Sequence, residues 1–251
     1  VAMALEMPEV REGGPFLACL PMFHIGGAGS PIWAMHQGAT IIIEPDTRPE
    51  ALLASLTGHR IETTHVVPTI LRSLCDLPQA READFSHLRH IAYGAAPMSP
   101  EVLQRCLALF KCRFTQFSGL TETTGPFAAL PFEHHQGERL WSCGRPMFGG
   151  RARILGPEGE ELPPGEIGEI VYQGPNLMTG YANRPDATAE AMRGGWFHTG
   201  DAGLMDAEGF LFIKDRIKDM IVTGGENVYP AEVEGVLAAH PDIADVAVIG
   251  V

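Results

Sequence analysis

The sequence predicts an α/β protein: a mostly parallel sheet with packed helices, a small antiparallel β lobe, and the start of an α+β C-terminal domain. Three observations support this prediction. Strand-like and helix-like segments alternate over about the first 130 residues, the pattern changes to Gly- and Pro-rich strands near Gly144, and it changes again after Arg216. We expect residues 1–143 to be part of a large N-terminal domain, residues 144–215 its β-rich subdomain, and residues 216–251 the beginning of a small C-terminal domain.

The alternating segments of the first part are short. Strands are indicated by β-branched or apolar runs, and helices by apolar residues three and four positions apart. In order they are a strand at 39–45, a helix at 49–59, a strand that becomes a helix at Pro68 (64–75), and a buried strand with a small-residue turn at 88–97. Ligands of parallel sheets bind at loops beyond the C-terminal ends of strands, where YGAAP and SGLTE are expected.

A further helix is predicted to begin after Ser99, which is a typical N-cap. Pro100 suits the first helical position and Glu101 suits the first turn, next to the positive end of the helix dipole. The apolar face of this helix is expected to hold Val102, Leu103, Cys106, Leu107 and Phe110. The segment RFTQFS (113–118) is predicted to be the following strand.

The second part of the chain has a different pattern. Residues 150–174 are predicted to form two strands joined by a turn rich in Gly, Pro and Glu, and residues 209–216 a third strand. A helix is expected to start near Pro230, with Val233, Val236 and Leu237 on one face. The apolar run at 243–251 is predicted to be a strand that follows this helix.

Composition narrows the classes of partner and compartment. The chain has 31 Asp and Glu against 18 Lys and Arg, a formal charge of −13, which argues against nucleic acid or anionic lipid as the main partner. Its five cysteines form no Cys-x-x-Cys pair, so we expect neither a zinc site nor a disulfide scaffold, and a cytoplasmic protein. No apolar run reaches the roughly 18 residues of a membrane span. The chain starts without Met and ends on a strand-like run, so we expect it to be an excerpt of a longer protein.

Four stretches carry residues that a stable fold does not require: PMFHIGG (21–27), YGAAP (93–97), QFSGLTETTG (116–125) and 194–234. Each also has a simple structural interpretation. His24 could be a half-buried core histidine, the Gly-Ala-Ala-Pro run a tight turn, and the residues at 121–124 surface groups or a local cap. Asp201 and Asp206 could be turn acids and Arg216 a solvated charge. The pair His134-His135 is interpreted as surface.

Taken together, these stretches resemble the core motifs of the adenylate-forming superfamily. The segments GLTET (119–123), WFHTGD (196–201) and DRIKDMIVTGGENVYPAEVE (215–234) match those motifs almost letter for letter. The superfamily contains acyl-CoA synthetases, the adenylation domains of peptide synthetases, and luciferases. The resemblance covers essentially the whole chain, and residues 224–234 are most similar to acyl-CoA synthetases that act on fatty or related carboxylic acids.

The resemblance implies a reaction in two halves. A carboxylate attacks the α-phosphorus of ATP and releases pyrophosphate, and the thiol of coenzyme A then attacks the acyl-AMP carbonyl and releases AMP. The expected substrates are ATP, coenzyme A and a small-molecule carboxylic acid, with Mg²⁺ as the metal and no integral membrane segment. A homodimer is a possible assembly. Because the first half brings a carboxylate against a polyphosphate, catalysis must come mainly from positioning and charge stabilisation.

The resemblance also implies roles for individual residues. Thr121 would hydrogen-bond the α-phosphate, Glu122 would hold Mg²⁺, Asp201 would accept hydrogen bonds from the ribose hydroxyls, and Arg216 would add a cation nearby. His24 would lie beside the acyl carboxylate. The adenine slot and the rest of the nucleotide site would involve Gly94, Ala95, Ala96, Pro97, Gln116, Phe117, Ser118 and Gly119.

The remaining implied roles belong to the small domain. Lys218 would be the hinge about which this domain rotates between the half-reactions. The segment Gly224, Gly225, Glu226 and Asn227 would line the coenzyme A channel, where backbone must pass close to a ligand.

The sequence departs from the family pattern in three ways. No Ser/Thr/Gly-rich phosphate loop precedes PMFH, and none of the three lysines (Lys111, Lys214, Lys218) occupies the motif of the adenylation lysine. Ser118 stands where the family commonly has Tyr. We therefore expect this polypeptide alone to be at best a very poor adenylating enzyme. Two alternatives stay open: an adenylation domain that loads a carrier protein, and a catalytically silent nucleotide-binding module.

Overall fold

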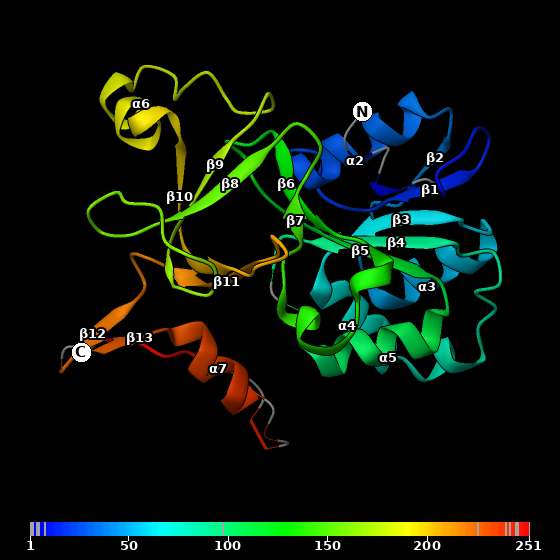
Figure 1. Cartoon of the computed structure of the whole chain (residues 1–251). Coiled ribbons are helices and arrows are strands. Elements are labelled where there is room, and N and C mark those ends of the chain that lie inside the picture. The colour runs from blue at the N-terminus through cyan, green and yellow to red at the C-terminus, as the bar shows by residue number, and fades with distance from the viewer. Residues whose placement is uncertain are drawn as a thin grey trace. The chain divides into compact units, whose positions relative to one another are not determined.

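The computed structural model describes residues 3, 6–7, 9–96, 98–224, 226–238, 240, 242–243 and 246–250. The chain divides into two compact units, Val1–Gly149 and Gly150–Val251, drawn in Figure 1. The predicted domain boundaries at 144 and 216 stay predictions. No helix within the described ranges is long and apolar enough to cross a membrane.

The first unit contains a seven-stranded sheet in the order β2-β1-β3-β4-β5-β6-β7. Strands β1 to β5 are parallel to their neighbours, and β6 and β7 are antiparallel additions. The strands are β1 (Pro15–Ala18), β2 (Thr40–Ile43), β3 (Thr63–Val66), β4 (His90–Gly94), β5 (Arg113–Leu120), β6 (Gly125–Leu130) and β7 (Arg145–Pro146). The predicted mostly parallel sheet is confirmed.

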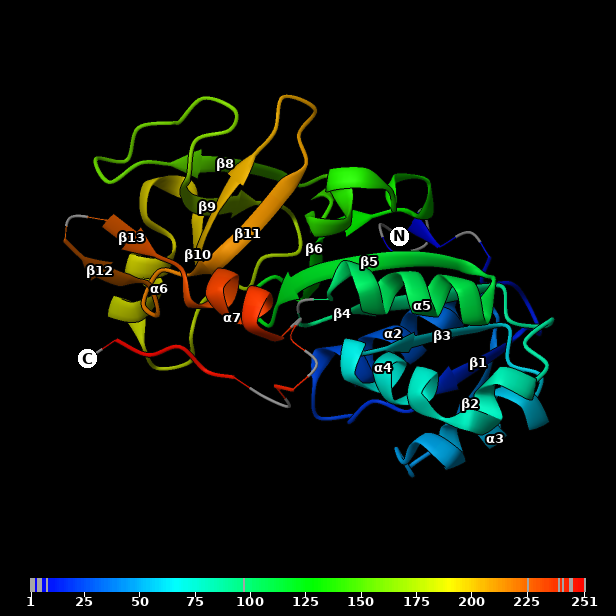
Figure 2. The ribbon, with the colours of Figure 1, turned by 90° about the horizontal axis from the view of Figure 1, so that it is seen from below.

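Helices cover both faces of this sheet. Figures 1 and 2 show α3, α4 and α5 on one face and α2 on the other. The helices are α2 (Ile25–His36), α3 (Pro49–Gly58), α4 (Pro68–Asp76) and α5 (Pro100–Phe110), with 3₁₀ helices η1 (Pro78–Glu82), η2 (Phe132–His134) and η3 (Gly137–Trp141). The predicted helix at 49–59 and the change from strand to helix at Pro68 are both confirmed.

Two hydrophobic cores follow from the alternation of side chains along the strands. In β1, Leu17 packs into the core under α3, α4 and α5, whereas Phe16 and Ala18 pack with Trp33 of α2 on the other side. Successive residues of a strand point to opposite faces, so a sheet covered on both faces needs apolar residues at nearly every position. This explains the continuous apolar runs by which the strands were predicted.

Helix α5 begins as its sequence predicts. The Ser99 hydroxyl accepts a hydrogen bond from the Val102 amide at 3.4 Å, and Pro100 occupies the first turn. Leu103 and Phe110 are buried on the predicted face. The helix ends at Lys111, whose φ of 51° places it in the left-handed region. Capping is a contact between near neighbours in the chain, which is why sequence alone predicts it.

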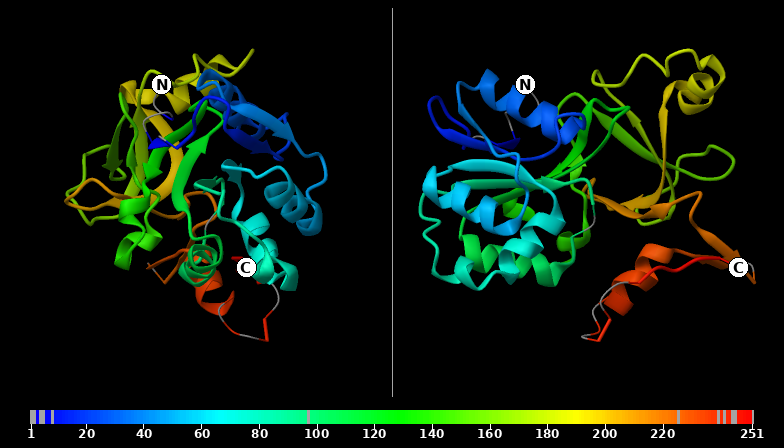
Figure 3. Two further views of the ribbon diagram at one scale, coloured as in Figure 1. Left: turned by 90° about the vertical axis from the view of Figure 1, so that its right-hand side faces the viewer. Right: turned by 180° about the vertical axis from the view of Figure 1, so that it is seen from behind.

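The second unit is built on a four-stranded antiparallel sheet in the order β11-β10-β9-β8, seen from two further sides in Figure 3. Its strands are β8 (Arg151–Leu155), β9 (Gly168–Gln173), β10 (Phe197–Met205) and β11 (Leu211–Arg216). A two-stranded ribbon and three helical segments accompany it: β12 (Ile221–Thr223), β13 (Glu226–Val228), α6 (Pro185–Ala191), η4 (Arg193–Gly195) and α7 (Pro230–Ala238). The predicted β lobe and the α+β continuation are confirmed.

The strand predicted at 243–251 is wrong for the residues that can be described there. Residues 246–250 have no strand assignment, although their sequence is apolar. The Val248 amide donates at 2.8 Å to the Glu234 carboxylate of α7 instead of to a neighbouring strand. An apolar run becomes a strand only where another strand supplies the ladder of hydrogen bonds, and the ribbon β12–β13 does not extend to this segment.

Candidate functional site

Two predicted segments of the first unit meet at the C-terminal ends of neighbouring parallel strands. Strand β4 ends at Gly94 and is paired with β5 so that Gly94 lies opposite Phe117 and Tyr93 opposite Gln116. The register brings the end of β4 beside Gln116 and Phe117 of β5, at the edge where ligands of parallel sheets bind. Pro97, the fourth residue of the predicted adenine wall, lies outside the described residues.

Two glycines at this edge are required by close backbone contacts. A Cβ at Gly94 would lie 2.0 Å from the Phe117 carbonyl oxygen, and one at Gly119 would lie 2.2 Å from the Gly125 carbonyl oxygen. Ala95 and Ala96 follow, both exposed, and Ala95 has a φ of 68°. The result is a close backbone contact between β4 and β5, followed by two exposed residues with small side chains at the strand edge.

The turn between β5 and β6 contains both solvent-accessible residues and one buried residue that holds the turn. Thr121 is exposed and Glu122 half-buried, whereas Thr123 is fully buried. The Thr123 hydroxyl accepts from the Leu120 amide at 3.0 Å and lies 2.5 Å from the Gly125 carbonyl oxygen, to which it can donate. Thr123 therefore holds the turn that presents Thr121 and Glu122, and the local-cap interpretation is correct for this residue.

Replacing Thr123 by Val is expected to lower the free energy of unfolding by about 1–3 kcal/mol, because the part-buried Leu120 amide loses its acceptor. Urea unfolding measures this loss. Thr123→Ser, which keeps the hydroxyl, and Thr121→Val, at an exposed position, are the controls. A full loss of stability in either control would contradict the assignment.

His24 lies at the beginning of α2 and not in a core. Its Nδ1 atom accepts a hydrogen bond from the Gly26 amide at 3.1 Å, and its side chain is exposed. The neighbouring Phe23 is 95% exposed, so the half-buried core interpretation of His24 is wrong. A Cβ at Gly125 would lie 3.5 Å from Ile25 Cγ1, which places the start of α2 against the end of the β5–β6 turn.

A second histidine in this region was not a candidate in the sequence analysis. His65 on β3 forms a short hydrogen bond to the Ser30 hydroxyl of α2, and its ring meets that of Phe117 edge to face at 6.2 Å. Burial lowers the pKa of His65 to about 4, and the nearby His24 adds to this shift. His65 is thus a neutral polar ring between the sheet and α2, and only the packing of β3 against α2 reveals it.

The interpretation of His134-His135 as a surface pair is wrong for His135. Its Nε2 atom lies 3.0 Å from the Tyr93 hydroxyl, and its Nδ1 atom lies 3.0 Å from the Pro131 carbonyl oxygen. Burial lowers the pKa of His135 to about 4. The ring is one of two partners of the hydroxyl of fully buried Tyr93, which also lies 3.1 Å from Gln116 Oε1.

The lowered pKa values of His65 and His135 predict that the free energy of unfolding decreases in acid. Their pKa values fall from 6.5 to about 4 on folding, so between these pH values the unfolded chain binds more protons than the native state. The contribution of these two rings to the free energy of unfolding is complete above pH 6.5. It is lost as the pH falls toward 4, by up to about 1.4 kcal/mol per pH unit for each ring. Urea unfolding of His135→Gln at several pH values should give a smaller slope. The exposed His59 supplies the control variant, and an equal change there would contradict the prediction.

In the second unit, the register of β10 and β11 places Asp201 directly opposite Arg216. The Arg216 Nε atom lies 3.0 Å from Asp201 Oδ1, and its Nη1 atom donates to the Thr199 carbonyl at 3.0 Å. Asp201 is 6% exposed, and burial raises the pKa of its carboxyl while Arg216 opposes this shift. Asp201 is therefore not a turn acid, and Arg216 is not an isolated solvated charge.

Asp206 shows the contrast. Its Oδ1 atom accepts hydrogen bonds from the Glu208 and Phe210 amides, both at 2.9 Å, so it is a turn acid as the simple interpretation predicts. It holds the turn between β10 and β11.

The predicted hinge and coenzyme A residues lie after β11. Lys218 is exposed in the turn that follows Arg216, and Gly224 has a φ of 60° in the turn between β12 and β13. Glu226 and Asn227 begin β13, and Gly225 lies outside the described residues. The Asp215 carboxylate accepts from the Ala231 amide at 2.8 Å, which connects β11 to the start of α7. The roles predicted for these residues stay predictions.

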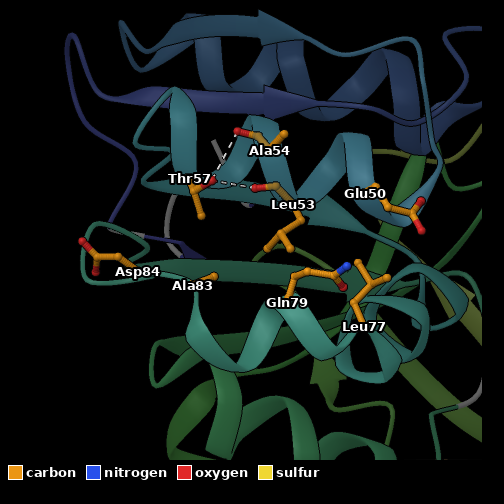
Figure 4. A pocket seen from close by; sticks show the side chains of 8 residues that line it. All are labelled: Glu50, Leu53, Ala54, Thr57, Leu77, Gln79, Ala83 and Asp84. Carbon is orange, nitrogen blue, oxygen red and sulfur yellow. Dashed lines mark hydrogen bonds between the residues drawn. The ribbon is translucent and has the colours of Figure 1, made fainter.

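A separate pocket of about 460 Å³ lies between α3 and η1, as Figure 4 shows. Apolar side chains such as Leu53 and Leu77 make up much of its lining, and no predicted site residue takes part. Its lining residues are Glu50, Leu53, Ala54, Thr57, Leu77, Gln79, Ala83 and Asp84.

Comparison with known proteins gives consistent matches. The model of the family described as AMP-binding enzyme matches residues 1–182. A fatty acid–[acyl-carrier-protein] ligase from Streptomyces coeruleorubidus is 40% identical over 248 residues, which are 98% of this chain and 48% of that protein. A feruloyl-CoA synthase from Amycolatopsis sp is 41% identical over 236 residues, 94% of this chain and 48% of the relative.

Solved structures agree with the sequence relatives. The o-succinylbenzoate CoA synthetase from Bacillus subtilis, in complex with its acyl-adenylate intermediate, superposes with a TM-score of 0.91 at 34% identity, covering 100% of this chain and 50% of that one. The amide bond synthetase from Marinactinospora thermotolerans gives a TM-score of 0.91 at 32% identity, with coverage of 99% and 51%. The chain thus spans about half the length of the relatives it matches.

The matches cover nearly the whole chain, and they agree with the resemblance that GLTET, WFHTGD and the 215–234 segment carry. The chain therefore belongs to the AMP-binding enzyme family of the adenylate-forming superfamily.

Proposed function

We propose that this chain is part of an ATP-dependent acid–CoA ligase that forms an acyl-adenylate and then an acyl-CoA. The observation that carries the proposal is the buried Asp201 carboxylate held by Arg216 within the WFHTGD motif. A carboxylate that is kept out of water yet aligned by a guanidinium is suited to accept two hydroxyl donors of a ribose. Family membership supplies the second support.

The residues of the first unit would handle the phosphate and the acid. The exposed Thr121 hydroxyl would donate to the α-phosphate, and the backbone at 94–96 would form a wall for adenine. His24, with its Nδ1 atom occupied by the Gly26 amide, has its Nε2 atom left to donate toward an acyl carboxylate. Positioning of this kind converts the attack of the carboxylate on phosphorus into a step within one complex.

Mg²⁺ would be held by Glu122. The β5–β6 turn carries the Glu122 carboxylate and the hydroxyls of Thr121 and Thr124, an all-oxygen set. Mg²⁺ prefers oxygen ligands and commonly binds through one or two carboxylates, substrate phosphates and several waters, so this set fits the ion. Bound Mg²⁺ would neutralise charge on the polyphosphate.

The second half-reaction would use the residues after β11. With Lys218 as the hinge, the segment from Gly224 to Asn227 would move to line a coenzyme A channel. The thiol would then attack the acyl carbonyl, and AMP would leave with the carboxylate oxygen that attacked phosphorus. Rotation about a few exposed turn residues is an ordinary hinge motion.

The acid is proposed to be a fatty acid, supported by the fatty acid–[acyl-carrier-protein] ligase at 40% identity. The same relative supports a second candidate acceptor, the pantetheine of a carrier protein in place of coenzyme A. We propose a cytoplasmic location, in keeping with five free cysteines: Cys19, Cys75, Cys106, Cys112 and Cys143.

The test is to incubate the full-length ligase, of which this chain is proposed to be a part, with ATP, a panel of fatty and aromatic acids, and either coenzyme A or a carrier protein. Acid-dependent pyrophosphate release and the acylated product are measured. Formation of acyl-CoA supports the proposal, whereas acylation of the carrier protein alone would favour the second candidate. Absence of AMP binding by calorimetry would contradict both.

Replacing Ser118 by Tyr is expected to tighten AMP binding, because the family commonly places a ring at this position. Stacking of a base on an aromatic ring is worth about 1–3 kcal/mol, or up to about a hundredfold in affinity. Isothermal calorimetry measures the change, with Ser118→Leu as a control for bulk without an aromatic face. Equal affinities of the Tyr variant and the unmodified chain would remove the hypothesis.

A further inference from the structure

Asp201 is paired with Arg216 of β11, but it lies in a part of β10 where the pairing with β9 is interrupted. His198 pairs with Val171 of β9, and the next paired residue is Ala202, opposite Glu169. Residues 199–201 therefore bulge opposite a single residue of β9. Gly200, in the middle, has a φ of 72°. A bulge re-aims side chains, but its backbone amides need partners other than the ladder.

The side chain of Glu169 supplies such partners. Its Oε1 atom accepts from the Gly200 amide at 3.2 Å, and its Oε2 atom accepts from His198 Nδ1 at 2.7 Å. Oε2 also accepts from Arg193 Nη2 at 3.0 Å. The Glu169 side chain is only 17% exposed. One carboxylate from β9 therefore binds the bulge at two points and is itself held by a cation.

The rest of the bulge is held from within and from the other strand. The Thr199 hydroxyl donates to the Ile170 carbonyl at 2.7 Å and accepts from the Asp201 amide at 3.0 Å. The Gly200 carbonyl accepts from the Ile217 amide at 2.9 Å. Glu169 is thus the contact from the β9 side that fixes the Gly200 amide, which belongs to the peptide group between residues 199 and 200, one peptide before Asp201.

We propose that Glu169 is a positioning residue of the nucleotide site, which fixes the bulge of β10 so that the Asp201 carboxylate is aligned for the ribose. This inference rests on the proposed function, because it takes Asp201 to bind ribose. Glu169 touches neither the nucleotide nor the reacting atoms in this assignment. It acts through Gly200 and His198.

The charge of Glu169 has two opposite effects on this role. A carboxylate beside Asp201 contributes to the raised pKa of Asp201, although burial is the larger cause and Arg216 opposes it. The placement therefore acts against ionisation of Asp201. The benefit of the charge is geometric. An ionised carboxylate at position 169 makes shorter and stronger hydrogen bonds to the Gly200 amide and to His198 than the neutral amide side chain of Gln would.

The test uses the ratio of affinities for AMP and its 2′-deoxy and 3′-deoxy forms, measured by calorimetry on the 251-residue chain. A merely structural role changes the folded fraction and moves all three affinities together, so the ratio isolates alignment. Glu169→Ala is expected to reduce the preference for AMP by about tenfold, equivalent to one charge-assisted hydrogen bond. Glu169→Gln keeps one oxygen acceptor and is expected to retain part of the preference.

Two further variants serve as the positive and the negative control for the affinity ratio. Asp201→Ala should abolish the preference for AMP. Glu166→Ala removes an exposed carboxylate just before β9 and should leave the ratio unchanged. If Asp201→Ala abolishes the preference while both Glu169 variants retain it in full, the positioning role is wrong and the proposed function stands. If the unmodified chain does not distinguish AMP from its deoxy forms, the proposed function is wrong and the inference falls with it.

Hydrogen exchange gives a readout that needs no nucleotide. The Gly200 amide is expected to exchange at least about tenfold faster in Glu169→Ala, because its acceptor is lost. The Asp201 amide keeps Thr199 as its partner and serves as the internal reference. Unchanged exchange at Gly200 in both Glu169 variants would overturn the inference.

Discussion

Replacing Asp201 by Ala is expected to weaken AMP binding about a hundredfold or more. The buried carboxylate is assigned two ribose hydroxyls, and a hydrogen bond to a charged group contributes about 1.5–3 kcal/mol. The variant also leaves Arg216 Nε without its carboxylate partner at 3.0 Å, so a cation near the ribose loses its alignment. Calorimetry of AMP binding measures the loss, and circular dichroism checks that the variant is folded.

Asp206→Ala is the matched control, since it removes a carboxylate at the other end of the same strand pair. This variant loses the two amide contacts of the turn and is expected to cost about 1–3 kcal/mol of stability. Its AMP affinity should stay within about twofold of the unmodified chain. Comparable losses of affinity in the two variants would mean that Asp201 acts only through folding.

Replacing Gly94 by Ala is expected to lower the free energy of unfolding by about 3 kcal/mol, near the upper end of overpacking costs. The added Cβ would lie 2.0 Å from the Phe117 carbonyl oxygen, and backbone cannot yield as a flexible side chain can. The end of β4 must separate from β5, so AMP affinity is expected to fall as well. Urea unfolding and calorimetry measure the two effects.

Gly58→Ala tests whether the effect comes from this contact or from the loss of a glycine. A Cβ at Gly58 meets nothing within 4 Å at the end of α3, so the change should be neutral or slightly stabilising. A loss of several kcal/mol there, or none at Gly94, would contradict the close-contact explanation.

Much of the fold could be predicted because its signals are local. The Ser99 cap joins residues three positions apart, and Pro68 starts α4 because proline suits the first turn of a helix. The strand predicted at 243–251 failed for the opposite reason. Its apolar residues indicate burial, but a strand also requires a neighbour, and the Val248 amide is bound by Glu234 of α7.

The residues of the candidate site also fall into those that the sequence indicates and those that only the packing reveals. Motif resemblance gave Thr121, Glu122 and Asp201 as candidates by residue type and order. It did not distinguish Thr123, whose buried hydroxyl holds the turn, and it gave no sign of His65. Both depend on contacts between segments that packing brings together, and one polar residue looks like another until its surroundings are known.

The sequence by itself determined the alternation of strands and helices over much of the first unit, the family motifs, and the residue types proposed for phosphate, ribose and metal. Only the tertiary structure decided which of them share a register: Gly94 with Phe117, and Asp201 with Arg216. It also decided that Glu169 reaches the bulge beneath Asp201. The physical reason is that propensity and capping act over a few residues, whereas strand register and the burial of polar groups depend on partners distant in the chain.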